Sequence, residues 1–180
     1  MSEEPYRSYS EKELAALPCA YRDDLFAGQV VLVTGAAGGI GTACSVLFGR
    51  LGATIVGCGR NADSLARLER NLGEIGISCW TRAMSIRDAD AVAALIDEVW
   101  MRSGRLDVMV NNAGGQFAAP ALDISPKGWH AVVETNLTGA WYMMQAGARQ
   151  WVAKKQPGCV VNMATLTGGA FVGIPHTAAS

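Results

Sequence analysis

A glycine-rich run at residues 34–41 (TGAAGGIG) constrains the fold of this chain more than any other sequence feature. It follows residues 29–34 (QVVLVT), which are apolar and β-branched enough for a strand buried on both faces. Residues 41–51 then carry apolar side chains at helical spacing. Free N–H groups at the start of such a helix can hold a pyrophosphate, which approaches closely where Cβ atoms are missing. The run therefore predicts a phosphate-binding turn, with a tight turn that binds no ligand as the alternative.

Short apolar runs and longer segments of helical spacing alternate along the rest of the chain. We expect further strands at residues 54–58, 79–84, 108–111 and 159–163. We expect helices at residues 63–72, 88–101 and 129–152, the first of them capped by Asp63. Strands that alternate with helices form parallel βαβ units with right-handed crossovers. The pattern predicts an α/β fold of the Rossmann type, with helices on both faces of a doubly wound parallel sheet in three layers.

The start of the chain differs from this alternating pattern. Residues 1–17 are polar and are interpreted as an extended arm or a short helix. No repeat, low-complexity tract or linker divides the residues that follow. We therefore expect an N-terminal arm at residues 1–25 and one dinucleotide-binding domain at residues 26–180.

Charge and cysteine content exclude several classes of protein. The chain has 15 basic and 16 acidic residues, so it lacks the basic excess of a nucleic-acid binder. No apolar window approaches the roughly 18 residues that a membrane span needs, so no membrane partner is expected. The five cysteines form no C-x-x-C pair, which disfavours a disulfide framework and a metal site. No signal peptide is recognised, so we expect a reducing cytoplasmic location and small-molecule or protein partners.

The second expected strand ends in Gly57-Cys58-Gly59-Arg60, without the acidic residue that would bind a ribose 2′-hydroxyl. Arg60 suits a 2′-phosphate instead, so NADP(H) is favoured over NAD(H). The alternative is a solvated arginine at a strand end, because no second basic residue stands within the glycine run. The cofactor-binding candidates in that run are Gly35, Ala37, Gly38, Gly39, Ile40 and Gly41.

Four ordered motifs carry a resemblance to a known family: TGAAGGIG at 34–41, NNAG at 111–114, ETNLTG at 134–139 and VVNMAT at 160–165. With these motifs the chain resembles the short-chain dehydrogenase/reductase family from residue 26 to its last residue. The resemblance implies that Ser85, in place of a common acid, holds the adenine amine, and that Asn136 is catalytic. It further implies that a turn lies beside the adenine ring, formed by Asn112, Ala113 and Gly114.

The helix expected at residues 129–152 has apolar residues on more than one face. One stripe at helical spacing consists of Trp129, Val133, Leu137, Trp141, Met144, Ala148 and Trp151. Two apolar faces suit a helix with a core side and a partner side. In the family the equivalent helix packs in a dimer interface, so the resemblance implies a homodimer or homotetramer. The alternative is a fully buried helix in a monomer.

A closer resemblance rests on NNAGGQF at residues 111–117 and KGWHAVVETNLTG at residues 127–139. These runs are similar to the peroxisomal-type trans-2-enoyl-CoA reductases, with the 2,4-dienoyl-CoA reductases as near relatives. The resemblance implies NADPH-dependent reduction of the 2,3 double bond of an enoyl thioester, in peroxisomes if the source is a eukaryote. The enolate oxygen that hydride delivery creates needs fixed hydrogen-bond donors. We expect Gln116 to face the thioester carbonyl, with a hydroxyl from Thr165 or Thr167.

Most members of this family use a Ser, a Tyr and a Lys, and the tyrosine exchanges a proton with a carbonyl or alcohol. Here Thr165 takes the serine position, Thr177 or Ala178 takes the tyrosine position, and residues 171–180 contain no tyrosine. This agrees with the enoyl-thioester branch, which also lacks that tyrosine. The lysine position falls beyond residue 180, so the resemblance implies a longer domain whose C-terminal strands are missing here. The alternatives are a short-chain reductase of a carbonyl or alcohol substrate and a catalytically silent nucleotide-binding fragment.

Two histidines complete the set of candidates. His176 follows a proline at the start of a short expected helix and is interpreted as a surface or capping residue, with catalysis as the alternative. His130 lies among Trp129, Val132 and Val133 and is interpreted as structural.

Overall fold

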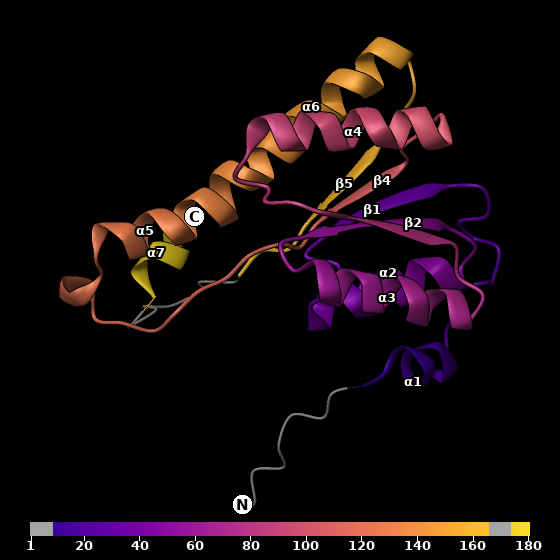
Figure 1. Ribbon diagram of the computed structural model, residues 1–180, viewed down its shortest axis with the longest axis horizontal. Coiled ribbons are helices and arrows are strands. Elements are labelled where there is room, and N and C mark those ends of the chain that lie inside the picture. The colour runs from indigo at the N-terminus through magenta and orange to yellow at the C-terminus, as the bar shows by residue number, and fades with distance from the viewer. Residues whose placement is uncertain (1–8, 166–173) are drawn as a thin grey trace, which may run out of the picture.

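A computed structural model describes residues 9–165 and 174–180, and Figure 1 shows its arrangement. Its centre is a parallel sheet of five strands in the order β3-β2-β1-β4-β5. The strands are β1 (Val30–Thr34), β2 (Thr54–Gly59), β3 (Cys79–Ala83), β4 (Val108–Asn111) and β5 (Cys159–Asn162). Each lies within a residue or two of its predicted range, because short β-branched runs bounded by turn residues suit buried parallel strands.

The strand order places a crevice at one end of the sheet. Strand β1 pairs with β2 on one side and with β4 on the other, so the chain winds outward in opposite directions from β1. The carboxyl ends of β1 and β4 therefore open a gap between diverging connections, which is where α/β sheets bind their ligands. The glycine run and the NNAG motif begin at these two strand ends.

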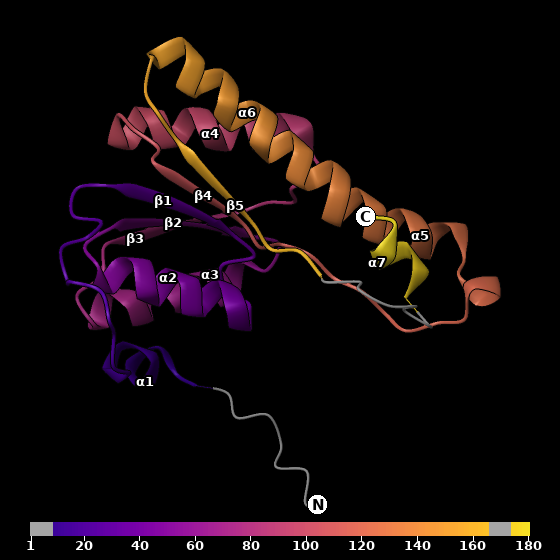
Figure 2. The ribbon, with the colours of Figure 1, turned by 180° about the vertical axis from the view of Figure 1, so that it is seen from behind.

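Helices cover both faces of the sheet, as the two opposite views show (Figures 1 and 2). One face lies under α4 (Ala89–Ser103) and α6 (Ala140–Lys154), with a core that includes Leu32 and Met109. The other face lies under α2 (Gly39–Arg50) and α3 (Ala62–Glu74), with a core that includes Val31 and Val33. Alternate residues of β1 thus enter opposite cores, and the predicted three-layer Rossmann-type fold is confirmed.

The prediction of a single helix at residues 129–152 is wrong. Three elements occupy this part of the chain: α5 (Pro126–Val133), a π-helical segment η2 (Glu134–Gly139), and α6. Helix α5 begins earlier than predicted because Pro126 stands at its first position and the Ser125 hydroxyl caps the Gly128 N–H at 3.1 Å. Within η2 the Thr135 hydroxyl donates to the Ala131 carbonyl at 2.8 Å. Hydrophobic periodicity predicts a helix but gives no sign of a π-helical turn within it.

Helix α3 also departs from its prediction at its start. The cap is Asn61, whose side-chain oxygen accepts from the Ser64 N–H at 2.8 Å, and Asp63 lies inside the first turn. Both residue types cap helices well, so sequence alone did not separate them.

The N-terminal arm contains a short helix, α1 (Glu11–Ala16), which packs beside α2 and α3 (Figure 1). Leu14 and Ala15 contact the core beneath, and Arg50 of α2 donates to the Leu14 carbonyl at 3.1 Å. Residues 1–8 of the predicted arm lie outside the described residues. Two short elements complete the described chain, the 3-10 helix η1 (Ala121–Asp123) and α7 (Pro175–Ala178).

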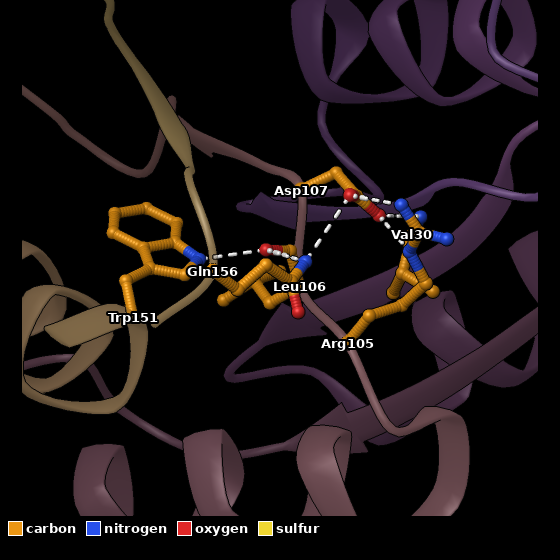
Figure 3. A network of polar contacts seen from close by, with 6 residues as sticks. All are labelled: Val30, Arg105, Leu106, Asp107, Trp151 and Gln156. Atoms are coloured by element: carbon orange, nitrogen blue, oxygen red, sulfur yellow. Dashed lines mark hydrogen bonds and ion pairs between the residues drawn. The ribbon is translucent and has the colours of Figure 1, made fainter. Parts of the chain in front are cut away.

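A polar network joins the amino ends of the central strands to the end of α6 (Figure 3). The Asp107 carboxylate accepts from the Val30 N–H at 2.8 Å and from both donating nitrogens of Arg105. The Leu106 carbonyl accepts from the indole of Trp151 at 2.6 Å. These contacts fix the end of the sheet opposite to the crevice.

No helix among residues 9–165 and 174–180 is both long and apolar enough to cross a membrane. The same residues contain no cluster of His, Cys, Asp or Glu that could hold a metal ion.

Candidate active site

The glycine run forms a tight turn that leads directly into α2. Gly35 has a φ of 64°, which favours glycine, and its carbonyl accepts from the Gly38 N–H at 3.0 Å. Gly41 is packed so closely against Gly35 that a side chain there would overlap the turn. No side chain caps α2, so the N–H groups of its first turn are free for an anion. At Gly39 a Cβ would meet nothing within 4 Å, so this glycine leaves open space for a ligand.

A hollow of about 870 Å³ lies against this turn. It brings together every predicted cofactor residue except Gly41: Gly35, Ala37, Gly38, Gly39, Ile40, Arg60, Ser85, Asn112, Ala113 and Gly114. Gly41 lies buried beneath the turn, so its contribution is to let α2 approach the strand end. The open space at Gly39, the uncapped helix start and the size of the hollow fit a dinucleotide.

The NNAG turn is tied to β1 by Thr34. Its hydroxyl accepts from the N–H groups of Asn112 and Ala113, at 3.0 and 2.8 Å. The side-chain nitrogen of Asn112 donates to the Thr34 carbonyl at 2.9 Å. The Asn112 side chain therefore holds the two strand ends together, and Gly114 follows along the wall of the hollow.

Two arginines line the hollow. Arg60 is exposed, and within the described residues it has no hydrogen bond or ion pair. Arg87 forms an ion pair with Glu134 of η2 at 3.6 Å. Arg87 is not among the residues predicted from sequence, because it lies outside both the glycine run and the end of β2. Its position two residues after Ser85, in the loop that follows β3, was the available signal.

A second hollow of about 550 Å³ shares Ile40, Asn112, Ala113 and Gly114 with the first. All four predicted catalytic residues line it: Gln116, Asn136, Thr165 and Thr177. They come from the loop after β4, from η2, from the segment that follows β5 and from α7. Thr167, the alternative hydroxyl donor, lies outside the described residues.

Asn136 joins three segments at the edge of the second hollow. Its side-chain oxygen accepts from the Gly115 N–H at 3.0 Å, and its nitrogen donates to the Gly115 carbonyl at 3.2 Å. The same nitrogen lies 3.4 Å from the hydroxyl of Ser180, which follows α7. Asn136 therefore fixes the loop that carries Gln116.

The lining of the second hollow includes a pair of asparagines that was not predicted from sequence. Asn111 and Asn162 lie opposite each other at the ends of β4 and β5. The Asn111 nitrogen donates to the Asn162 oxygen at 2.8 Å, and the Asn111 oxygen is buried without a partner. Only the register of two strands distant in sequence brings these side chains together.

The structure contradicts the prediction for both histidines, because His176 is buried and His130 is exposed. His176 has no exposed surface, and its ring packs edge to face on Phe117 with centroids 4.5 Å apart. It is therefore neither a surface nor a capping residue. His130 is exposed on α5, where it faces away from the core. The short α7 packs against α5 and buries the histidine that follows Pro175.

Cys58 is buried and Cys79 is half-buried, and the surroundings of both thiols favour the neutral form. Burial raises the pKa of Cys58 to about 12. Burial, with a smaller effect from the Glu69 carboxylate, raises the pKa of Cys79 to about 12 as well. Neither thiol supplies a thiolate near neutral pH.

The parallel sheet with a glycine turn at its central crevice defines a dinucleotide-binding α/β protein. Within that class, the model of the short chain dehydrogenase family matches residues 29–179. The chain belongs to this family, which confirms the resemblance drawn from its motifs.

Three known proteins show the range of its relatives. A probable 2,4-dienoyl-CoA reductase [(2E)-enoyl-CoA-producing] of Bacillus subtilis is 36% identical over 155 residues, which cover 84% of this chain and 60% of the relative. A metagenomic short-chain oxidoreductase in complex with NADP is 36% identical with a TM-score of 0.78, covering 85% of this chain and 70% of that one. An NAD+-bound xylitol dehydrogenase is 29% identical with a TM-score of 0.81, covering 86% and 60%. The chain spans between 51% and 60% of the length of the first curated relatives it matches.

Proposed function

We propose that the protein reduces the 2,3 double bond of an enoyl thioester, such as an enoyl-CoA, with NADPH. The observation that carries this proposal is the composition of the second hollow. Its polar lining consists mainly of amides and hydroxyls, and Thr177 and Ala178, the two candidates for the position of the family's tyrosine, both line it. Amides and hydroxyls can donate hydrogen bonds to a carbonyl oxygen but do not exchange protons readily at neutral pH. The similarity to a dienoyl-CoA reductase supports the same substrate class.

The first hollow supports the preference for NADP(H). Arg60 stands at the end of β2 where an NAD(H) site would carry an acid, and Arg87 adds a second guanidinium to the same hollow. The turn at residues 35–40 would hold the pyrophosphate through the uncapped start of α2. Solved relatives bind either NADP or NAD+, so the preference rests on this chain's own residues.

The residues of the second hollow would bind the thioester and stabilise the charge that develops on it. A bound reduced dinucleotide supplies the hydride in this chemistry. The amide of Gln116 and the hydroxyl of Thr165 would donate to the thioester carbonyl oxygen, whose negative charge grows as the β-carbon is reduced. Asn136 would hold Gln116 in place through its two hydrogen bonds to Gly115.

A homo-oligomer is part of the proposal. The outer face of η2 and α6 exposes large apolar side chains, with Leu137 at 50%, Trp141 at 54% and Val152 at 78% exposure. Contiguous apolar surface of this kind marks a protein–protein contact. A second copy of the chain is the occupant we propose.

The direct test follows NADPH oxidation in the presence of crotonyl-CoA and a longer enoyl-CoA. We expect NADPH-dependent reduction of the enoyl thioesters. We expect neither reduction of acetoacetyl-CoA with NADPH nor oxidation of xylitol with the oxidised cofactor. Gln116→Ala should reduce enoyl-CoA turnover about 100-fold with little change in NADPH affinity, because one donor to a developing oxyanion has that magnitude. Reduction of a ketone would favour the carbonyl alternative. Tight NADPH binding without any turnover would favour a nucleotide-binding protein without catalytic activity.

A further inference from the structure

The loop that follows β3 forms one wall of the first hollow and also contacts η2. Residues 84–87 all line that hollow. The Arg87 guanidinium forms an ion pair with the carboxylate of Glu134, the first residue of η2, at 3.6 Å. Ile86 is buried beside the other end of η2, where a Cβ on Gly139 would lie 2.7 Å from its side chain and 3.1 Å from its carbonyl oxygen. Two consecutive residues of this wall therefore contact both ends of the π-helical segment.

Segment η2 also reaches the second hollow. Thr135 lines the first hollow, whereas Asn136 and Leu137 line the second. Asn136 bonds both the N–H and the carbonyl of Gly115, at 3.0 and 3.2 Å, so its position fixes the loop that carries Gln116. Turns of π-helix are rare and occur frequently at functional sites. Because the wall of the first hollow contacts both ends of η2, that wall helps to set where Asn136 lies in the second.

We propose that these contacts couple the two hollows: a ligand at the adenosine end of the first strengthens binding of the thioester in the second, through the Arg87–Glu134 ion pair. Glu134 is then a positioning residue, because within the described chain it lines neither hollow. The inference rests on the proposed function and assigns the adenosine end of the cofactor to Arg60 and Ser85.

The coupling has a physical cause in the loop at residues 85–87. The Arg87 N–H donates to the Ser85 hydroxyl at 3.3 Å, a long hydrogen bond, so a ligand that contacts both residues would fix the loop further. A thioester that binds next has less of η2 left to order, and its affinity rises because the entropic cost is smaller. The ion pair is part-exposed, with 33% of the Arg87 and 50% of the Glu134 side chain accessible, which limits the expected effect to about fivefold.

Two small ligands test the coupling without turnover. Adenosine 2′,5′-bisphosphate resembles only the adenosine end of the cofactor and carries no nicotinamide to reach the second hollow. Crotonyl-N-acetylcysteamine is a thioester without a nucleotide, so it does not compete for the adenosine end. In the wild-type protein we expect saturating bisphosphate to lower the Kd of this thioester about fivefold, measured by isothermal titration calorimetry. Saturating thioester should lower the Kd of the bisphosphate by the same factor, because coupling between two sites is reciprocal.

Glu134→Gln removes the charge from one side of the ion pair without changing the lining of either hollow. We expect bisphosphate to change the thioester Kd less than about twofold in this variant. A purely structural role would alter single Kd values and leave their ratio unchanged. Glu74→Gln is the matched control, because Glu74 is 59% exposed, pairs with Lys12 at 3.1 Å and lies on α3; it should keep the full effect.

Equal tightening in wild type and in Glu134→Gln would overturn the inference, as would no tightening in a wild-type protein that reduces crotonyl-CoA with NADPH. Should Glu134→Gln fail to fold, hydrogen exchange of the wild type decides. Bisphosphate alone must then slow exchange of the amides at residues 134–139, and unchanged exchange contradicts the inference. A wild-type protein that does not reduce crotonyl-CoA contradicts the proposed function, and the inference with it. Turnover is measured separately, so the two failures are distinguishable.

Discussion

At the scale of single residues, Arg60 decides the proposed cofactor preference. Arg60→Gln should raise the Kd for NADPH about tenfold or more and leave the Kd for NADH unchanged, because a charge-assisted hydrogen bond to the 2′-phosphate would be lost. Fluorescence titration with both cofactors measures this. Arg70→Gln, an exposed arginine on α3 outside the hollow, is the control. An equal loss for both cofactors in Arg60→Gln would contradict the preference.

Cys58 gives a residue-scale prediction about pH. Its pKa is raised from 9.0 to about 12 in the folded protein by burial. Between these values the unfolded chain loses the proton that the folded protein keeps, so stability falls as pH rises above about 9. Urea unfolding from pH 7.5 to 10.5 should show this fall in wild type and a shallower one in Cys58→Ala. Cys79 contributes to the decrease of the unfolding free energy with pH in both proteins. The same decrease in wild type and Cys58→Ala would show that Cys58 does not titrate in this way.

At the scale of elements, the π-helical segment η2 places Asn136 at the edge of the second hollow. Gly139 ends this segment, and a Cβ there would lie 2.7 Å from the Ile86 side chain. Gly139→Ala should therefore shift η2, cost about 1–3 kcal/mol of stability and lower kcat/KM for crotonyl-CoA about tenfold. Chemical denaturation and steady-state kinetics measure the two effects.

A second glycine provides the matched control for that experiment. A Cβ at Gly73 of α3 meets nothing within 4 Å. Gly73→Ala should add about 0.5–1 kcal/mol of stability, because alanine favours the helix, and it should leave activity unchanged. If both variants behave alike, the close contact at Gly139 does not control the position of η2.

The network at the amino ends of β1 and β4 is the other element-scale feature. Asp107→Ala leaves the buried Val30 N–H without its acceptor and should cost about 1–3 kcal/mol. Arg105→Gln removes only the half-exposed ion pair and should cost less than about 1 kcal/mol. Denaturant unfolding of both variants tests the order. A larger loss for Arg105→Gln would place the main contribution in the ion pair instead of the strand end.

At the scale of the whole molecule, the exposed apolar face of η2 and α6 predicts self-association. Val152→Arg places a charge in that face and should convert the oligomer to a monomer, measured by size-exclusion chromatography with light scattering. Met101→Arg is the control, because Met101 is 81% exposed on α4. A wild-type protein that is monomeric at micromolar concentration would contradict the proposal.

Most of the sheet could be predicted from sequence because its strands are short, β-branched and separated by helical runs. The glycine turn could be predicted for a related reason: residues 34–41 are contiguous, so their order alone specifies a strand, a turn and a helix start. Arg87, the Asn111–Asn162 pair and the buried His176 could not be found in this way. Arg87 pairs with Glu134, the two asparagines meet through the register of their strands, and His176 packs on Phe117. Each of these contacts joins segments that are distant in sequence.

The sequence by itself determined the parallel three-layer fold, the glycine turn after β1 and the family, because these depend on local patterns whose period and spacing are fixed by backbone geometry. Only the tertiary structure decided which side chains share the second hollow. Gln116, Asn136, Thr165 and Thr177 meet there because parallel strands bring their carboxyl ends to one edge and a π-helical turn re-aims the helix that follows. Tertiary packing also decided that His176 is buried without a partner, since burial is a property of neighbours distant in sequence.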